Sequence, residues 1–216
     1  FKRWFRGLFK FKEQARRKNL QNIAPFRDIE GWLTDNEALG LYLTAARLAP
    51  GAKVVEIGSW QGKSTYCLAK GLPSGKVYAI DPFNADWGQD VDSKEEYIDR
   101  GGNKNMLKGF NERMTTLGVY NKIIVKKGYS YDFYNDTDFN SIDFLFIDGD
   151  HSIEGCKADY ESYAPKIVKG GFIAFHDYEA DRTQTGPTYI IDNIVIPSAD
   201  FEFYKLEDSL WIAKKK

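Results

Sequence analysis

FLFIDGDH (residues 144–151) and GGFIAFHD (residues 170–177) are the two stretches that decide the fold of this chain. Each contains a short apolar run of β-branched and aromatic residues, as a strand buried on both faces must. Between them, residues 153–167 carry apolar side chains at helical spacing, which predicts a helix. The strand, helix, strand order predicts two parallel strands joined by a right-handed crossover.

Acids and histidines follow both runs. Asp148, Asp150 and His151 come after the first, and His176 and Asp177 come after the second. Parallel strands joined in this way open their carboxyl ends on one edge of the sheet, and in open α/β sheets that edge holds the ligand crevice. A single aspartate often only terminates a strand. Several ionisable residues converging on one edge instead predict a functional site.

Length and composition predict one main α/β domain. The chain has 216 residues and a formal net charge of −1, and residues 29–216 show no break in composition. No basic stripe runs through this body, so a nucleic-acid partner is not expected. Cys67 and Cys156 each fall in a predicted helix, which favours reduced, buried thiols. No apolar run is long enough to span a bilayer, and cations interrupt any signal-peptide core, so we expect a cytoplasmic protein.

Residues 1–28 form a separate basic and aromatic segment, for which we predict a helix. The first twenty residues hold eight Lys or Arg and a single Glu. Apolar side chains recur on one face of this helix, namely Phe1, Trp4, Phe5, Leu8 and Phe9. Such a face suits a membrane surface, which would make the protein membrane-peripheral. It also suits the domain itself or a second subunit of a homo-oligomer, which is the interpretation we favour.

A second informative stretch is KVVEIGSWQGKST at residues 53–65, which predicts a strand, a tight glycine turn and a helix to about Lys70. It lacks the G-x-G-x-x-G of dinucleotide sites. A P-loop has four residues between its first glycine and the Gly-Lys-Ser, whereas Gly58 and Gly62 enclose only three. The strand ending in Asp148 nevertheless resembles the magnesium-binding strand of P-loop NTPases. The next predicted strand ends in Asp81, about twenty residues beyond the turn, where an acid can bind ribose hydroxyls. These features favour a nucleoside ligand without a polyphosphate.

Four segments together resemble the class I S-adenosylmethionine-dependent methyltransferases. They are EIGSWQGKST (56–65), AIDPF (79–83), FIDGDH (146–151) and AFHDY (174–178). More narrowly, the chain is similar to the bacterial branch that includes macrocin-type sugar O-methyltransferases and cephalosporin-hydroxylase-like proteins. The resemblance extends from about Ile29 to the C-terminus.

The resemblance implies a Rossmann-like three-layer α/β sandwich whose mostly parallel sheet has seven strands and ends in an antiparallel hairpin. By pattern alone, residues 201–206 and 210–214 fit that hairpin. The resemblance also implies S-adenosylmethionine as cofactor, with Asp81 at the ribose and Tyr129 and Ser130 at the adenine. The residues expected around the cofactor are Glu56, Gly58, Ser59, Gly62, Ser64, Asp81, Pro82, Phe83, Tyr129, Ser130 and Asp148.

Methyl transfer from a sulfonium requires an aligned nucleophile and a base that removes its proton. By resemblance to metal-dependent O-methyltransferases, Asp148, His176 and Asp177 become ligands of a divalent metal, and Asp150 becomes the candidate base. His176 stands where the sugar methyltransferases have an acid. Imidazole suits manganese, iron or zinc better than magnesium, and His176 or His151 could alternatively be the base without a metal. Loops 84–102, with Trp87 and Tyr97, and 178–187 are expected to select the substrate.

The sequence therefore predicts a methyltransferase that methylates a hydroxyl of a sugar-like or other small hydroxylated metabolite, assisted by Mg or Mn. The alternative is a cofactor-binding protein that uses the methyltransferase fold for another reaction or a regulatory role, since fold alone does not set function. A phosphate-binding NTPase is the third interpretation, and the short glycine turn disfavours it.

Overall fold

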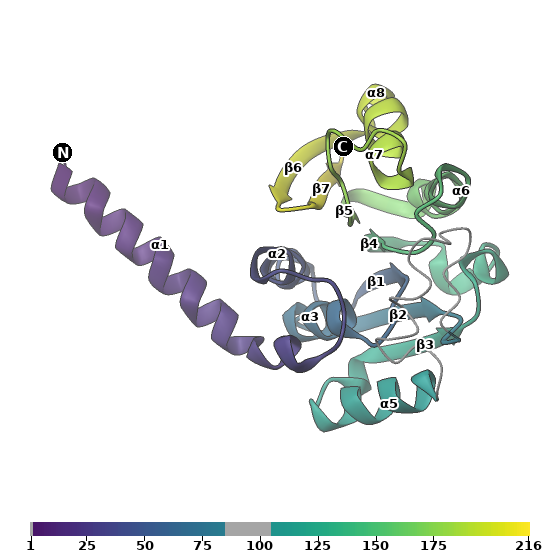
Figure 1. Cartoon of the computed structure of the whole chain (residues 1–216), viewed down its shortest axis with the longest axis horizontal. Coiled ribbons are helices and arrows are strands. Elements are labelled where there is room, and N and C mark those ends of the chain that lie inside the picture. Colours follow the sequence, from purple (N-terminus) through teal and green to yellow (C-terminus); the bar gives the residue numbers. More distant parts are fainter. Residues whose placement is uncertain (1, 85–104) are drawn as a thin grey trace.

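The computed structural model of the chain describes residues 2–84 and 105–216, with side chains described from residue 11 onward. Its centre is a seven-stranded sheet with the order β3-β2-β1-β4-β5-β7-β6 (Figure 1). The strands are β1 (Ala52–Ile57), β2 (Gly75–Asp81), β3 (Ile123–Lys127), β4 (Ile142–Ile147), β5 (Ile167–Phe175), β6 (Phe201–Glu207) and β7 (Leu210–Lys215). The first five are parallel, and β7 pairs antiparallel with both β5 and β6. The predicted fold class and the C-terminal hairpin are confirmed.

Helices cover both faces of the sheet. The α-helices are α1 (Lys2–Asn22), α2 (Asp35–Ala45), α3 (Lys63–Gly71), α5 (Met106–Thr116), α6 (Ile153–Tyr163), α7 (Gly186–Ile190) and α8 (Ile196–Ser198). Short helical turns are η1 (Ala24–Asp28), η3 (Tyr120–Lys122), η4 (Ser130–Phe133), η5 (Thr137–Phe139), η6 (Ala164–Lys166) and η7 (Ile191–Val195). Along β4, Phe144 and Phe146 join the core under α2, α3 and α5, whereas Leu145 and Ile147 join the core under α6 and α7. Alternate residues thus pack in opposite layers, as expected of a strand buried on both faces.

One predicted boundary is wrong. The helix expected over residues 153–167 ends at Tyr163, and Ala164–Lys166 form a separate turn before β5 begins at Ile167. Pro165 explains the difference, because proline lacks the N–H needed to continue a helix and restricts the residue before it. The two cysteines behave as predicted, since both are free and buried in helices.

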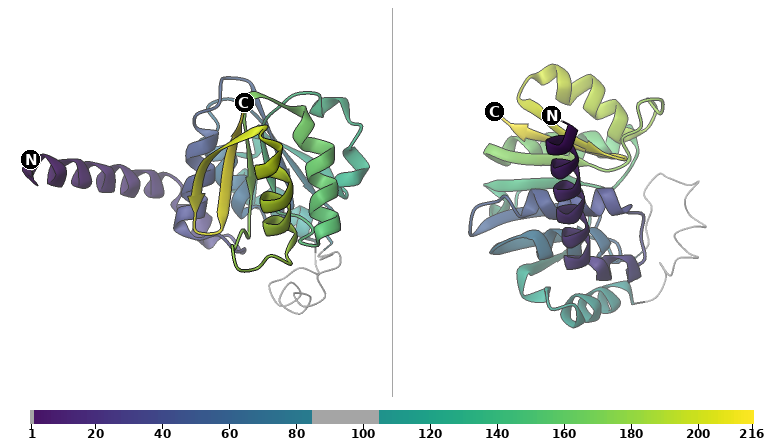
Figure 2. Two further views of the ribbon diagram at one scale, coloured as in Figure 1. Left: turned by 90° about the horizontal axis from the view of Figure 1, so that it is seen from above. Right: turned by 90° about the vertical axis from the view of Figure 1, so that its left-hand side faces the viewer.

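The N-terminal segment is helical, as predicted, and α1 projects away from the rest of the molecule (Figure 2). The core nevertheless begins before residue 29, because Leu20, Ile23 and Phe26 are buried in it together with Ile29. The apolar face of residues 1–9 lies outside the side chains that the structure describes, as does most of the loop 84–102. Across residues 2–84 and 105–216, no helix combines the length and the apolar character needed to span a bilayer.

Candidate functional site

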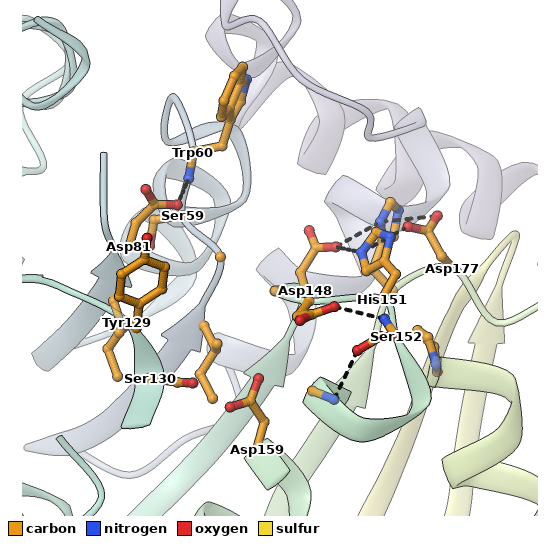
Figure 3. Close-up of a pocket in the computed structure, with 18 of the residues that line it drawn as sticks. Ser59, Trp60, Asp81, Tyr129, Ser130, Asp148, His151, Ser152, Asp159 and Asp177 are labelled. Carbon is orange, nitrogen blue, oxygen red and sulfur yellow. Dashed lines mark hydrogen bonds and ion pairs between the residues drawn. The ribbon is translucent and has the colours of Figure 1, made fainter. Parts of the chain in front are cut away.

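A cavity of about 730 Å³ opens at the edge of the sheet where β1, β2, β4 and β5 end. Its lining includes the residues that directly follow or end these strands, namely Gly58, Asp81, Asp148 and His176. Figure 3 shows Asp81 on one side of this space and Asp148 on the other. The edge predicted from the sequence therefore exists, and it encloses one continuous site.

The glycine turn is locked against the neighbouring strand. Gly58 has a φ of +88°, and a Cβ there would lie 1.9 Å from the carbonyl oxygen of Asp148. The Gly58 N–H donates to the carbonyl of Ile80 at 2.9 Å, and the Asp148 N–H donates to the carbonyl of Ile57 at 2.9 Å. These bonds join the ends of β1, β2 and β4. Only glycine combines this backbone conformation with so close an approach.

Glu56 supports the turn from below. Its carboxylate accepts hydrogen bonds from the hydroxyls of Ser59, at 2.7 Å, and Thr65. The side chain is fully buried, and burial raises its pKa to about 7. Of the residues expected at the cofactor, Gly58, Ser59, Ser64, Asp81, Pro82, Tyr129, Ser130 and Asp148 line the cavity, while Glu56, Gly62 and Phe83 lie outside its lining. Glu56 thus fixes the turn rather than facing the cavity.

Asp81 is held at the end of β2 by backbone donors. Its carboxylate accepts from the N–H of Trp60 at 2.8 Å and from the N–H of Phe83 at 2.6 Å. Burial raises its pKa, and the side chain is 8% exposed at the cavity wall. The carboxylate is therefore fixed in place and still reachable by a ligand, as ribose binding requires.

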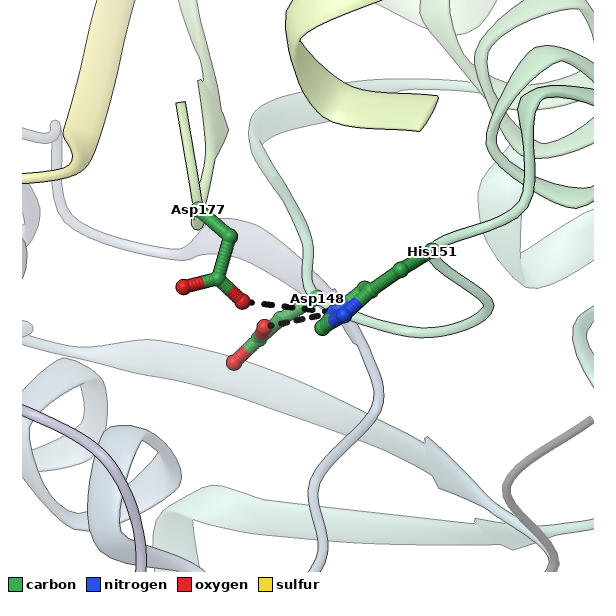
Figure 4. Close-up of side chains that lie close together, drawn as sticks. All are labelled: Asp148, His151 and Asp177. Carbon is green, nitrogen blue, oxygen red and sulfur yellow. Dashed lines mark ion pairs between the residues drawn. The ribbon is translucent and has the colours of Figure 1, made fainter. Parts of the chain in front are cut away.

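Across the cavity, acids and imidazoles form a compact cluster (Figure 4). One ligand atom each of Asp148, His151 and Asp177 lie within 4.8 Å of one another. His151 Nε2 lies 3.6 Å from Asp148 Oδ1 and 3.5 Å from Asp177 Oδ2. His176 Nδ1 lies 3.3 Å from Asp148 Oδ1 and 3.4 Å from Asp177 Oδ1. The structure brings together all the predicted metal ligands and adds His151 to them.

A protein family described as "Methyltransferase domain" matches residues 55–178, which is more than half of the chain. The chain belongs to this methyltransferase family. The curated protein R132 of Acanthamoeba polyphaga mimivirus is 30% identical over 159 residues, which cover 71% of this chain and 64% of R132. The alignment thus spans a little under two thirds of that relative.

Solved O-methyltransferases share the fold of this methyltransferase domain. NovP is 13% identical with a TM-score of 0.65, covering 84% of this chain and 80% of NovP. TomG from Streptomyces achromogenes was solved in complex with S-adenosylmethionine. It is 16% identical with a TM-score of 0.62, and the match covers 94% of this chain and 89% of TomG. The resemblance to class I methyltransferases is confirmed for family and fold.

A further residue, which the sequence did not reveal, adjoins the charged cluster. Glu37, at the start of α2, lies 3.4 Å from His176 Nε2 and accepts from the N–H and hydroxyl of Ser209 at 3.0 and 2.7 Å. Burial opposes its charge, but His176 and Ser209 lower its pKa to about 2. In turn, Asp148, Asp177 and Glu37 raise the pKa of His176 well above its ordinary value, although burial opposes this. Glu37 also forms a capping box with Thr34 at the start of α2, so the same carboxylate supports the helix and faces His176.

Two other acids of the domain lie apart from this cluster. The Asp150 carboxylate lines the cavity and accepts at 2.8 Å from the N–H of Ser152, the N-cap residue of α6. Asp159, on α6, also lines the cavity and was not predicted. Lys63, the lysine of the P-loop-like Gly-Lys-Ser, donates to the carbonyl of Gly31 at 2.9 Å and so holds the stretch between η1 and α2.

Proposed function

We propose that this chain is an S-adenosylmethionine-dependent O-methyltransferase that methylates a hydroxyl of a sugar-like or other small hydroxylated metabolite. One observation carries the proposal: the glycine turn with Asp81, and the cluster of Asp148, His151 and Asp177, line the same cavity. A nucleoside sulfonium on the first would direct its methyl group toward an acceptor at the second. Aligning the two reactants is the main task in a methyl transfer.

The side of the cavity around Asp81 suits the cofactor. The Asp81 carboxylate would accept hydrogen bonds from the ribose hydroxyls, and Tyr129 and Ser130 would flank the adenine. Gly58 lets the chain turn without a side chain where the methionine end would pass. Glu56 acts indirectly, by holding Ser59 and Thr65.

We assign the removal of the acceptor proton to His151. Its Nε2 lies beside both Asp148 and Asp177, which raise its pKa against the opposing effect of burial. An imidazole with a raised pKa is a stronger proton acceptor. Asp150, the candidate from the sequence, is instead engaged by the Ser152 N–H at the start of α6.

We retain Asp148, His176 and Asp177 as the proposed ligands of a divalent cation and add His151, since one ligand atom each of Asp148, His151 and Asp177 lie within 4.8 Å of one another. Ligand atoms about 2.1 Å from one ion lie roughly 3.0–3.4 Å apart, and the carboxylates of Asp148 and Asp177 stand 3.3 and 3.4 Å from His176 Nδ1. A mixed carboxylate and imidazole set favours manganese over magnesium. Such a cation would lower the pKa of an acceptor hydroxyl. Glu37 would hold the His176 ring from its far side, as carboxylates behind metal-binding histidines do.

Calorimetry and a methyl-transfer assay test the proposal. We expect the protein to bind S-adenosylhomocysteine and not ATP, and to methylate at least one member of a panel of sugars and small polyols when Mn²⁺ is present. His151→Asn should lower kcat by about 10²-fold or more, and Asp150→Asn should change it far less. Binding without any methyl transfer would favour a cofactor-binding or regulatory role. Absence of cofactor binding would overturn the proposal.

A further inference from the structure

A second cavity lies at the edge of the sheet opposite the proposed methyl-transfer site. It has a volume of about 370 Å³ and opens beside the N-terminal ends of β1, β4 and β5. Single residues of β6 and β7 complete its lining. No residue lines both this cavity and the first one. A ligand here would therefore occupy a site of its own, of the size that small molecules use.

An irregularity in strand pairing forms one wall of this second cavity. Ile142 of β4 pairs with Ile167 of β5, and two residues later Phe144 pairs with Phe172, which is five residues later on β5. The residues between Ile167 and Phe172 therefore leave the regular ladder, and they line the cavity. Gly170, with a φ of +80°, provides the backbone conformation that this detour needs. Such bulges frequently accompany binding sites.

The charges around the second cavity are mostly positive. Three cations, Arg47, Lys169 and Lys214, line it with a single acid. In residues 11–84 and 105–216, none of these cations forms an ion pair or donates a side-chain hydrogen bond. Arg47 and Lys214 instead lie over aromatic rings, each 5.9 Å from the centroid of Tyr204 and Phe172 respectively. Their N–H groups are thus available to an anion.

These donors suit a phosphate group. The planar guanidinium of Arg47 can meet two phosphate oxygens with parallel N–H groups, and each lysine adds a compact positive charge. A phosphate monoester carries a charge of about −1.5 to −2 at neutral pH, so it uses three cations more fully than a carboxylate with a single charge does.

Beside the cations, the cavity offers a flat apolar surface and an acceptor. The Tyr204 ring is 36% exposed and is held by an edge contact with Phe172, at 5.3 Å between centroids. Asp143, the acid of the lining, accepts from the N–H of Lys53 at 2.8 Å through Oδ2. Its Oδ1 accepts no hydrogen bond within the part of the chain that the structure describes. A hydroxylated ring could cover Tyr204 and donate to Asp143.

We propose that this cavity is a second binding site, which takes the phosphate monoester of a small hydroxylated ring such as a sugar. The phosphate meets Arg47, Lys169 and Lys214, and the ring lies on Tyr204. The site goes beyond the proposed methyl transfer and does not depend on it, because the two cavities share no residue.

Calorimetry with glucose 6-phosphate, inorganic phosphate and glucose tests this site. The titrations are made at low ionic strength, with S-adenosylhomocysteine in excess to occupy the first cavity. We expect the wild-type protein to bind glucose 6-phosphate, to bind inorganic phosphate about tenfold more weakly, and to show no binding of glucose. Added salt should weaken both interactions, because it screens exposed charges.

Variants locate the binding. Arg47→Gln and Lys214→Gln should each lower the affinity for glucose 6-phosphate by about tenfold, as expected when a hydrogen bond to a charged group is lost. Tyr204→Ala should remove the advantage of glucose 6-phosphate over inorganic phosphate. Arg17→Gln is the matched control, since it removes an exposed arginine of α1 that does not line the cavity, and it should change nothing.

Three results would overturn the inference. The first is no binding of glucose 6-phosphate by the wild-type protein, and the second is an unchanged affinity in both Arg47→Gln and Lys214→Gln. The third is equal affinity for glucose 6-phosphate and inorganic phosphate, which would mean that the ring contributes nothing. The binding of S-adenosylhomocysteine is measured separately, so failure of the proposed function remains distinguishable from all three.

Discussion

The pKa values of the acids shift in opposite directions on the two sides of the cavity. On the nucleoside side, which we define by Asp81 and Asp159 of the lining and by Glu56 behind the glycine turn, burial raises the pKa of every one of these acids. On the charged side, defined by Asp148, His151, His176 and Asp177 of the lining and by Glu37 behind His176, the histidines lower the pKa of Glu37 and Asp177 although desolvation opposes this.

The difference follows from the partners. Backbone N–H groups and hydroxyls alone hold the acids of the nucleoside side, whereas Glu37 and Asp177 of the charged side also meet imidazole rings. Neutral donors only partly offset the loss of water around a charge, but an opposite charge can more than offset it. The nucleoside side is thus suited to a ligand with many neutral donors, and the charged side to a cation and to proton transfer. Four variants would break or sharpen this contrast.

Gly58→Ala should have the largest effect, because it damages the joint between the two sides. The new Cβ would overlap the carbonyl of Asp148, and φ is +88°. We expect a loss of roughly 4 kcal/mol or more in the free energy of unfolding, measured with urea. Gly118→Ala is the matched control, since its φ is +71° with no atom within 4 Å of the new Cβ. It should cost only about 1–2 kcal/mol, and equal losses would refute the steric account.

Glu56→Gln should alter how stability depends on pH. Because the folded-state pKa of about 7 exceeds the ordinary 4.5, the folded protein binds the proton more tightly. The wild-type protein should then be most stable below pH 4.5 with respect to this group, and lose stability as pH rises from 4.5 to 7. Each pKa unit corresponds to about 1.4 kcal/mol. The free energy of unfolding of Glu56→Gln, relative to that of the wild type, should therefore rise by on the order of 3 kcal/mol from pH 4.5 to pH 7. The free energies of unfolding would be measured with urea at pH 5 and at pH 8 for both proteins. The same difference between variant and wild type at both pH values would contradict this prediction.

Asp177→Ala should affect the charged side alone. We expect its affinity for Mn²⁺, measured by calorimetry, to fall by about 100-fold, since removing a ligand should cost at least as much as removing its supporting residues. The affinity for S-adenosylhomocysteine should stay unchanged. Asp181→Ala removes an exposed acid from the same loop and serves as control. If Mn²⁺ binds wild type and Asp177→Ala equally well, the cation does not use this cluster.

Asp81→Asn should weaken cofactor binding and leave metal binding unchanged, which is the reverse of Asp177→Ala, with a somewhat smaller effect. The asparagine retains one acceptor but loses the charge that the ribose hydroxyls would meet. We expect binding of S-adenosylhomocysteine to weaken by about 10- to 100-fold, while Mn²⁺ affinity stays the same. Loss of both affinities together would mean that the two sides are not separate units.

Much of the fold could be predicted from residue patterns. The apolar runs of β4 and β5 each end in acids, and the glycine turn between β1 and α3 is fixed by positions where a side chain would collide. These constraints are local, so the spacing of apolar residues and the positions of turn residues reveal them directly. The end of α6 was missed because helical spacing continued past Tyr163, whereas Pro165 ended the helix.

The candidate site was only partly predictable. Asp81, Asp148, His176 and Asp177 follow strands whose shared edge is implied by parallel topology. Glu37 and Asp159 lie within helices, where an acid ordinarily faces solvent, and no local pattern marked Glu37 as buried behind His176 or Asp159 as buried at the cavity. Our proposal of His151 rather than Asp150 as base also rests on the coordinates, because the two are adjacent in sequence and meet different partners.

The sequence by itself determined the layered sheet, the glycine turn and the row of acids at strand ends, since hydrophobic periodicity and glycine torsions act over a few neighbouring residues. Only the tertiary structure decided which acid meets which partner. Glu37 reaches His176 because α2 packs beside the β6–β7 turn and the end of β5, far away in the chain. Burial and charge pairing depend on all elements that surround a group, so the division between a nucleoside side and a charged side arises only when the chain is folded.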